Sequence, residues 1–248
     1  YGGTLVSIGD VFLDGRTDKT ALNYMGNTHG SLVQVKNQWY VFYHRQTNLH
    51  QFSRQACAEK IFIESDGTIK QAEITSCGLN NGALLGKGKY PARIACNLRA
   101  AVGCSFYSFN DKQEKAGDPY FTQDLPDCDP NPQTLPVQYI ANLQNGAMAG
   151  FKYFQFDGEN GKISVKVRGK AVGKIFIATK LNEKCDNGEV AGCFNKAKDI
   201  VAEIAVDVDS AEDWVEFSAD LAVSVGQQAL YFVFEIDGVL EFLEFGLE

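Results

Sequence analysis

Residues 26–46 read GNTHGSLVQVKNQWYVFYHRQ, and this stretch decides how the first third of the chain folds. A glycine-flanked turn that carries His29 leads into the apolar run 32–35, and a polar turn then leads into the aromatic run 39–43. Aromatic and β-branched residues favour strands, and an apolar run without polar alternation favours a strand that is buried on both faces. The stretch therefore predicts a β-hairpin whose second strand is covered on both sides.

The sequence around this hairpin shows strand periodicity punctuated by turn residues. The Asp66–Gly67 pair is a hairpin turn signal, and a longer polar loop is expected at 47–53. Antiparallel strands are expected over 31–35, 39–46, 59–64 and 68–75. Such a series of four strands is the content of one β-propeller blade, whose two apolar faces neighbouring blades normally cover. We therefore expect this segment to require neighbours from another chain or from the second part of this one.

The rest of the chain also reads as strands, after a short, glycine-rich and basic stretch at 84–91 that predicts a domain boundary. Inward and outward residues alternate clearly at 163–168. Strands are expected over 93–98, 148–156, 162–168, 174–179, 200–206, 229–235 and 240–247. Many short strands separated by turns are typical of a jelly-roll β-sandwich. The expected fold class is all-β, with a partial β-propeller of about one four-stranded blade over residues 1–86 and a β-sandwich over 87–248.

Composition excludes two classes of partner. The 248 residues are 45% hydrophobic, with 31 acidic against 23 basic side chains and a formal net charge of −8. A surface of this sign repels phosphate backbones, so no nucleic acid partner is expected. No stretch approaches the roughly 20 apolar residues that cross a bilayer, so no membrane partner is expected either. The chain begins at Tyr1 without methionine or a leader, which predicts an internal or processed start.

Seven cysteines, an odd number, leave at least one thiol unpaired within the chain. Their spacings form no C-x-x-C signature for zinc or redox chemistry. Cys185 and Cys193 bracket a polar segment that a disulfide could close, and Cys57 and Cys77 lie on either side of the Asp66–Gly67 turn. Each pair is either a disulfide or two thiols, since free cysteine is commonly buried. Disulfides would favour an extracellular location.

Two sets of motifs carry resemblances to known families. Residues 26–46, with FSRQ at 52–55 and TSCGL at 75–79 behind them, resemble the closing part of the catalytic domain in glycoside hydrolase family 43. Four segments further along the chain resemble a family 6 type carbohydrate-binding module. They are YIANLQNGAMAGFKYF at 139–154, the Asp213–Trp214 turn, ALYF at 229–232 and FLEF at 242–245. The resemblances imply that residues 1–86 are the C-terminal blade of a five-bladed β-propeller glycosidase domain. They imply a carbohydrate-binding-module-like β-sandwich for residues 87–248.

The first resemblance also implies what the chain lacks. The family hydrolyses glycosides with inversion, using an aspartate as general base, a glutamate as general acid and a further aspartate that tunes the acid. Those residues lie in earlier blades. The acidic residues of the first third match none of these motifs and are expected to be solvated surface charges; they are Asp10, Asp14, Asp18, Glu59, Glu64 and Glu73. No catalytic residue is therefore assigned, and the chain alone is expected to be inactive although it resembles part of an enzyme.

Two polar residues of the first third match functional positions of the family. The matching histidine lies close to an axial calcium ion in many relatives, so His29 is a candidate for contact with substrate and with calcium. Its alternative role is to satisfy backbone groups of the turn, and calcium prefers oxygen donors. Arg54 matches an arginine that faces the sugar in some relatives, where its fixed donors suit paired hydroxyls. Its alternative is an ordinary surface arginine.

The second resemblance implies a sugar platform in the sandwich. Sugar rings stack their apolar faces on exposed aromatic rings, and polar side chains hold the hydroxyls. Trp214 is the stacking candidate, with Tyr120 and Tyr139 as partners, and structural packing is the alternative for each. Two residues depart from the family pattern, because Met148 stands where relatives tend to carry tryptophan and Glu241 where binding members often carry asparagine.

These expectations combine into one leading hypothesis. The chain is the C-terminal part of a secreted, inverting, arabinofuranosidase- or xylosidase-like glycosidase that acts on arabinoxylan, xylan or arabinan. Its partners are this polysaccharide and the N-terminal propeller segment that would supply acid and base. The first alternative is a stand-alone carbohydrate-binding or adhesive β-sandwich protein without catalysis, and the second is a truncated product without activity.

Overall fold

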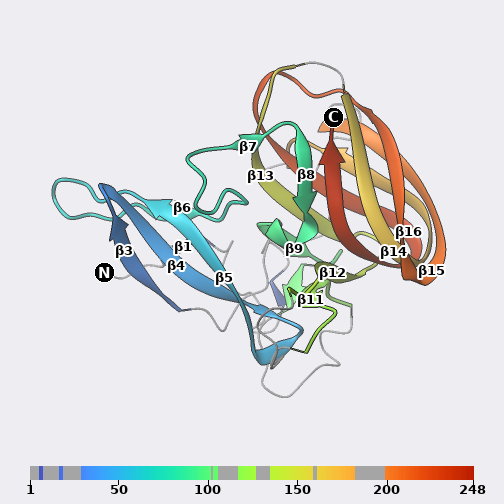
Figure 1. Ribbon diagram of the computed structural model, residues 1–248, viewed down its shortest axis with the longest axis horizontal. Coiled ribbons are helices and arrows are strands. Elements are labelled where there is room, and N and C mark those ends of the chain that lie inside the picture. The colour runs from blue at the N-terminus through green and yellow to red at the C-terminus, as the bar shows by residue number, and fades with distance from the viewer. Residues whose placement is uncertain are drawn as a thin grey trace.

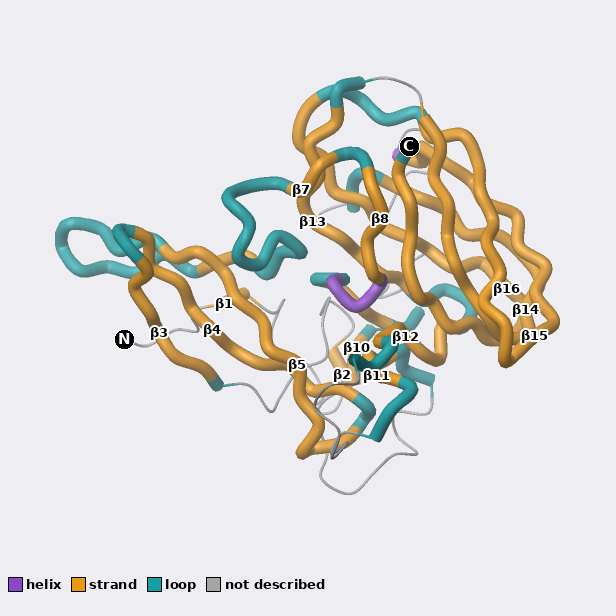
Figure 2. Tube along the Cα trace, in the orientation of Figure 1, coloured by secondary structure: helices purple, strands orange, loops and turns teal. Residues whose placement is uncertain are grey.

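Two mainly antiparallel β-sheets of unequal size lie side by side in the protein (Figure 1). The structure is a computed structural model that describes residues 6–7, 17–18, 29–101, 103–105, 117–126, 135–158, 161–181 and 199–248. Over these residues nearly all regular structure is strand, and the 3-10 turn η1 (Ala92–Ile94) is the short helical segment in Figure 2. The expected all-β class is therefore confirmed.

The smaller sheet has three strands, β3 (Gly30–Val35), β4 (Gln38–Thr47) and β5 (His50–Ile61). The predicted hairpin is present, with Val35 opposite Gln38 in the ladder. The prediction of a longer polar loop at 47–53 is wrong, because only two residues connect the end of β4 to the start of β5. Those residues, Asn48 and Leu49, have φ angles of 55° and 45°, which is the left-handed geometry of a tight hairpin turn.

The fourth strand expected at 68–75 does not join this sheet. Within that range only β6 (Ala72–Glu73) is a strand, and it pairs in parallel with β1 (Val6–Ser7). The reason is local, because the Glu59 side chain accepts hydrogen bonds from the backbone and the hydroxyl of Thr75, at 2.7 and 2.8 Å. A side chain thus takes the place that a backbone ladder would hold, and the blade-like sheet keeps three strands among the described residues.

The smaller sheet exposes apolar side chains on both of its faces. Every residue of β3 is exposed, and Leu32 and Val33, which point to opposite faces, are 38% and 40% exposed. The aromatic strand β4 is mostly half-buried rather than covered on both sides as predicted. Val41 and Ile61 are buried against Ala72, so among the described residues it is the β3 side of the sheet that lacks the cover that its apolar pattern requires.

Nine strands form the larger sheet, which curls so that its layers face each other (Figure 1). They are β7 (Leu84–Leu85), β8 (Gly88–Pro91), β9 (Asn97–Arg99), β11 (Tyr120–Gln123), β12 (Gln138–Leu143), β13 (Met148–Phe156), β14 (Gly161–Ala178), β15 (Ile200–Leu221) and β16 (Gly226–Leu247). A further two-stranded sheet joins β2 (Thr17–Asp18) to β10 (Cys104–Ser105). Because β7 pairs with β13, the chain enters the larger sheet before residue 86. The domain boundary between residues 86 and 87 stays a prediction.

Three of these strands are much longer than the sequence suggests. The separate strands expected at 162–168 and 174–179 are one strand, β14, and those at 229–235 and 240–247 are one strand, β16. The strand expected at 200–206 is β15, which continues to Leu221. Glycines interrupt the apolar pattern without ending the ladder. Gly238 has a φ of 116°, and a Cβ there would collide with the carbonyl oxygen of Lys170 on the neighbouring strand. The glycine therefore allows a close backbone approach inside a continuous strand.

Interlocking phenylalanine rings fill the space between the layers of the larger sheet. Phe151 packs against Phe245 and Phe232 with ring centroids 4.7 and 5.2 Å apart, and Phe232 packs against Phe242 at 5.3 Å. All four side chains are fully buried. Edge-to-face and tilted aromatic pairs at these distances add to the free energy that the burial itself contributes.

Arg45 joins the two sheets. Its guanidinium donates hydrogen bonds to the carbonyl oxygens of Ala95 and Arg93, and it lies 3.6 Å from the ring centroid of Phe121. A guanidinium over an aromatic face adds electrostatic attraction to these charge-assisted hydrogen bonds. The β4–β5 hairpin is thereby held against the edge of the larger sheet.

We expect Phe232→Ala to lower the free energy of unfolding by about 3–5 kcal/mol, because it leaves a cavity in the ring cluster. Phe52→Ala removes the same atoms from a side chain that is 71% exposed and should change it by less than about 0.5 kcal/mol. Urea denaturation followed by circular dichroism measures both. Equal losses for the two variants would contradict the assignment of the core.

Candidate functional site

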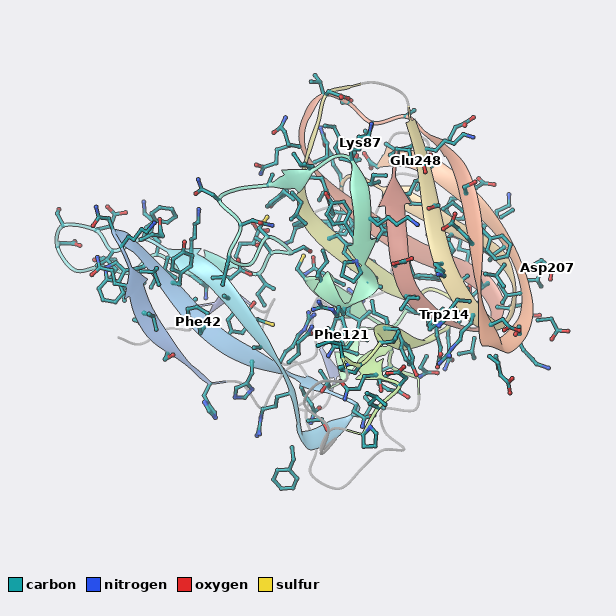
Figure 3. The ribbon with its side chains drawn as sticks, in the orientation of Figure 1. Phe42, Lys87, Phe121, Asp207, Trp214 and Glu248 are labelled. Atoms are coloured by element: carbon teal, nitrogen blue, oxygen red, sulfur yellow. The ribbon has the colours of Figure 1, made fainter. Side chains whose placement is uncertain are left out.

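An aromatic and charged cluster forms where a bulge interrupts the β14–β15 ladder. Val167 pairs with Val215 and Gly169 pairs with Ser210, so residues 211–214 of β15 face Arg168 alone on β14. The three extra residues push Trp214 out of the regular ladder. Figure 3 shows Trp214 at the end of the long strands, near β12. The turn expected at Asp213–Trp214 is thus a bulge within a strand.

Arg168 is the centre of this cluster. Its guanidinium carbon lies 4.4 Å from the Trp214 ring centroid and 4.9 Å from that of Tyr139, and its Nε donates to a carboxylate oxygen of Glu241 at 2.5 Å. The Tyr139 and Trp214 rings meet edge to face with centroids 5.4 Å apart. The charge of Arg168 is therefore compensated by Glu241 while its flat face covers two aromatic rings.

Tyr120 completes the cluster from β11. Tyr120 and Tyr139 share one face of the β11–β12 ladder, in which Tyr120 pairs with Ala141 and Tyr139 pairs with Thr122. Burial raises the pKa of both phenols, and the negative charge of Glu241 raises each further. The cluster thus holds neutral phenols beside one ion pair. Neutral hydroxyls and paired charges are donors and acceptors of the kind that recognise sugar hydroxyls.

The structure brings together the three sandwich residues that the sequence predicts as a sugar platform. Trp214 and Tyr120 are half-buried, whereas Tyr139 is buried and serves mainly to pack. The sequence analysis missed Arg168, although its place opposite the Asp213–Trp214 pair becomes evident once the register is known. Because Arg168 covers one face of the indole, a sugar would have to stack on the other face.

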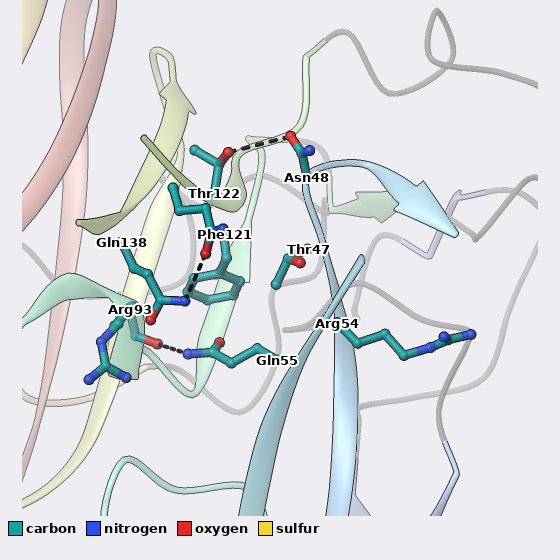
Figure 4. A pocket seen from close by; sticks show the side chains of 9 residues that line it. Thr47, Asn48, Arg54, Gln55, Arg93, Phe121, Thr122 and Gln138 are labelled. Carbon is teal, nitrogen blue, oxygen red and sulfur yellow. Dashed lines mark hydrogen bonds between the residues drawn. The ribbon is translucent and has the colours of Figure 1, made fainter. Parts of the chain in front are cut away.

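His29 and Arg54 lie on the smaller sheet, not beside Trp214. His29 is exposed just before β3, and its ring contacts that of His44. Arg54 is exposed on β5 opposite Gln46. Arg54 is also among the residues that line a hollow of about 40 Å³ beside Phe121, and Figure 4 shows its side chain extending away from that ring. The predicted site residues therefore fall into two groups on two sheets.

The contact of His29 with calcium that the family resemblance implies stays a prediction. Calcium takes six to eight oxygen ligands, whereas the described ring neighbour of His29 is a second imidazole. Within the described ranges no group of three or more histidine, cysteine, aspartate or glutamate side chains is arranged to hold a metal ion.

Glu59 is buried, which corrects its expected place on the surface. It is 5% exposed on β5, and the Tyr43 hydroxyl donates to it at 3.4 Å in addition to the two bonds from Thr75. Burial raises the pKa of the Glu59 carboxyl to about 7, although these hydrogen bonds oppose the shift. Glu59 lines a hollow of about 280 Å³ between β4, β5 and the 93–95 segment.

The other described acidic side chains of the first third differ in whether they tie strands together or lie on the surface. Glu73 is half exposed but accepts from the buried Lys152 at 2.6 Å and from the Tyr153 hydroxyl, so it ties β6 to β13. Glu64 pairs with Lys70 on the surface, as expected. Asp10, Asp14 and the side chain of Asp18 lie outside the described residues.

Cys57 and Cys77 are free thiols, so the disulfide between them is not present. The Cys77 sulfur lies 3.6 Å from the carbonyl oxygen of Lys152 on β13, whereas the Cys57 sulfur stays beside its own strand, 3.9 Å from the carbonyl oxygen of Gln55. The segment that carries Cys77 therefore packs against the larger sheet. The pair Cys185 and Cys193 lies outside the described residues.

The search of curated proteins finds a relative that matches the whole of this chain. A protein described as "Xylosidase/arabinosidase" from Thermoclostridium stercorarium is 38% identical over 248 residues, which are 100% of this chain and 48% of that protein. The chain thus spans about half the length of this curated relative. No protein-family model matches the chain. Within the described part, no helix is long and apolar enough to cross a membrane.

Solved structures show the likeness of the fold. A glycoside hydrolase family 43 arabinoxylan arabinofuranohydrolase from Bacillus subtilis, in complex with cellotetraose, superposes with a TM-score of 0.53 at 20% identity. The match covers 89% of this chain and 40% of that one. A β-1,3-glucan binding CBM6 from Bacillus halodurans reaches a TM-score of 0.46 at 10% identity over 67% of this chain and 99% of that one. The fold is therefore similar to part of a family 43 enzyme.

We expect Glu59→Gln to change how stability depends on pH. The folded-state pKa of about 7 lies above the ordinary value of 4.5, so the wild type binds an extra proton when folded and loses stability as pH rises from 4.5 to 7. The loss amounts to about 3 kcal/mol. Glutamine mimics the protonated carboxyl and removes this dependence.

Urea denaturation at pH 5 and pH 8 measures this effect, with Glu64→Gln on the exposed Lys70 pair as the control. The stability difference between Glu59→Gln and the wild type should increase toward pH 8, while that of the control stays nearly constant. A pH-independent difference for Glu59→Gln would contradict the raised pKa.

Proposed function

We propose that this chain is the C-terminal portion of a secreted family 43 glycosidase that acts on arabinose- or xylose-containing plant polysaccharide. The observation that carries the proposal is the 38% identity to a xylosidase/arabinosidase across all 248 residues. The likeness of the fold to a family 43 arabinoxylan arabinofuranohydrolase supports it. Secretion follows from the substrate, because a polymeric plant polysaccharide lies outside the cell.

In this proposal the three-stranded sheet is one wall of a five-bladed propeller. The exposed apolar residues on both of its faces, such as Leu32 and Val33, support this role because adjacent blades would cover them. The partner is a preceding propeller segment of the kind that the unmatched half of the relative has room to encode.

The chain contributes no acid or base in this proposal. The described carboxylates of the first third each have a structural contact: Glu59 holds Thr75, Glu64 pairs with Lys70, Asp66 accepts from the Thr68 backbone and Glu73 pairs with Lys152. A glycosidase needs one carboxyl group that gives a proton and a second that activates water on the other side of the sugar. The preceding segment would supply both.

The β-sandwich, with its jelly-roll topology, would hold the polysaccharide near the propeller. Trp214 offers the stacking surface, Tyr120 offers a neutral hydroxyl, and the Arg168–Glu241 ion pair fixes the rim. The alternative, a stand-alone carbohydrate-binding or adhesive protein, is favoured by this same cluster because it requires no propeller. Both hypotheses predict binding of arabinoxylan, xylan or arabinan, and only the first predicts that catalysis appears when a propeller segment is added.

Trp214→Ala should weaken binding to xylan or arabinan about tenfold, because it removes the stacking surface. Affinity electrophoresis in gels that contain each polysaccharide measures this. The control is Phe62→Ala, which removes an aromatic ring that is 62% exposed elsewhere. Equal retardation of the wild type and Trp214→Ala would remove the cluster from the proposal, and no retardation on any glycan would count against both binding hypotheses.

The purified chain should not hydrolyse aryl arabinofuranosides or aryl xylosides. The described acidic side chains of the first third serve folding contacts, and this proposal assigns the acid and the base to the preceding segment. Release of the aryl alcohol, followed by absorbance, measures turnover. Robust turnover by the chain alone would overturn the assignment of acid and base to another segment.

A further inference from the structure

The hollow of about 280 Å³ beside Glu59 lies between the smaller sheet and the segments that follow it along the chain. One side is a face of β4 and β5, because Tyr43 pairs with Cys57 and Glu59 is the next position on that face of β5. Residues of the segments 74–79 and 93–95 form the other sides. All of these elements belong to this chain, so the hollow exists without a preceding propeller segment.

We propose that this hollow binds a single uncharged sugar ring of about the size of a pentose. Pockets for drug-sized ligands begin at roughly 300 Å³, so a hollow just below that size suits a ligand of one ring. None of the residues that line it belongs to the cluster around Trp214. The proposal therefore goes beyond the sugar platform of the proposed function, and its ligand is a free monosaccharide rather than a polymer.

The polar groups of the hollow suit the hydroxyls of a sugar. The Glu59 carboxylate accepts from the backbone and the hydroxyl of Thr75, and from the Tyr43 hydroxyl over a longer distance of 3.4 Å. These three contacts leave one of the roughly four acceptor sites of a carboxylate unused. A sugar hydroxyl can therefore donate to Glu59, and the Tyr43 hydroxyl, whose bond to Glu59 is long, can donate to a sugar oxygen.

Apolar side chains supply much of the remaining lining, among them Ile74, Leu79 and Ile94. A sugar ring has an apolar face of C–H groups as well as hydroxyls, so it uses both kinds of surface. The charges favour a neutral ligand, because an anion would lie near Glu59 and a cation near Arg45, each facing a group of its own sign. An uncharged ring avoids both repulsions.

Protection of the Cys57 thiol from alkylation tests the proposal, because Cys57 is a free thiol that lines the hollow. The chain reacts with iodoacetamide at pH 8, with and without L-arabinose or D-xylose in excess, and peptide mass spectrometry follows each thiol. The choice of these two pentoses rests on the proposed function, whereas the hollow itself does not. We expect at least one of them to slow the alkylation of Cys57 about threefold or more.

Cys77 is the matched control within the same molecule. It is also a free thiol, but it does not line the hollow, and its sulfur lies against the carbonyl oxygen of Lys152. Its alkylation rate should stay the same when Cys57 is protected. Equal slowing of both thiols would show a general effect of sugar on the protein and would overturn the proposal.

Two variants test whether the sugar lies in the hollow. Tyr43→Phe removes one hydroxyl, so the sugar concentration that half-protects Cys57 should rise about threefold or more. Tyr40→Phe is its control and should change nothing, because Tyr40 lies on the opposite face of β4. Leu79→Ala removes part of the apolar lining from a side chain that is 61% exposed, so it should weaken protection without preventing folding.

The Trp214→Ala variant separates this site from the aromatic cluster, and Cys57 should be protected in it as in the wild type. A failure to bind polysaccharide gels would count against the proposed function and would leave the protection of Cys57 unaffected. The proposal would be overturned by no protection of Cys57 by either pentose, by its loss in Trp214→Ala, by equal effects of Tyr40→Phe and Tyr43→Phe, or by stronger protection from the anion D-glucuronate.

Discussion

The hydrogen-bonded ladder of β16 is the constraint on which the larger sheet depends. This strand pairs with β14 along most of its length, and its other edge pairs in turn with β13, β12 and β8. Phe232, Phe242 and Phe245 project from it into the core, so one strand carries both the backbone ladder and the ring cluster. Because β16 runs through both layers, a register error in it would move every one of these rings out of the core.

The candidate sugar site follows from this ladder and from one irregularity in its neighbour. The regular register of β14 places Arg168 beside Glu241 of β16, and the bulge in β15 delivers Trp214 to the other side of the same guanidinium. Neither contact needs a loop. A site built on strands keeps its geometry, since Arg168 and Glu241 are positioned by the paired backbones of β14 and β16.

The three-stranded sheet is held in a different way, by side chains at its margins. Arg45 reaches across to carbonyl groups beside η1, Glu73 reaches to Lys152, and Glu59 holds the segment that carries Thr75. Val41 and Ile61 are buried against Ala72 on one face, whereas β3 is exposed throughout. A sheet with an exposed apolar strand at one side is what a wall beside a neighbouring unit requires.

The amino-acid sequence by itself determined the strand class, the 26–46 hairpin and the alternation at 163–168, because these depend on side-chain periodicity along one segment. It also identified Trp214, Tyr139 and Tyr120, through residue type and family resemblance. Only the tertiary structure decided that Glu59 is buried, that Arg168 joins the aromatic cluster, that His29 faces His44 and that short predicted strands merge into β14 and β16. Each of these depends on which strands pair and in which register, and that choice is made by the free energy of the whole core.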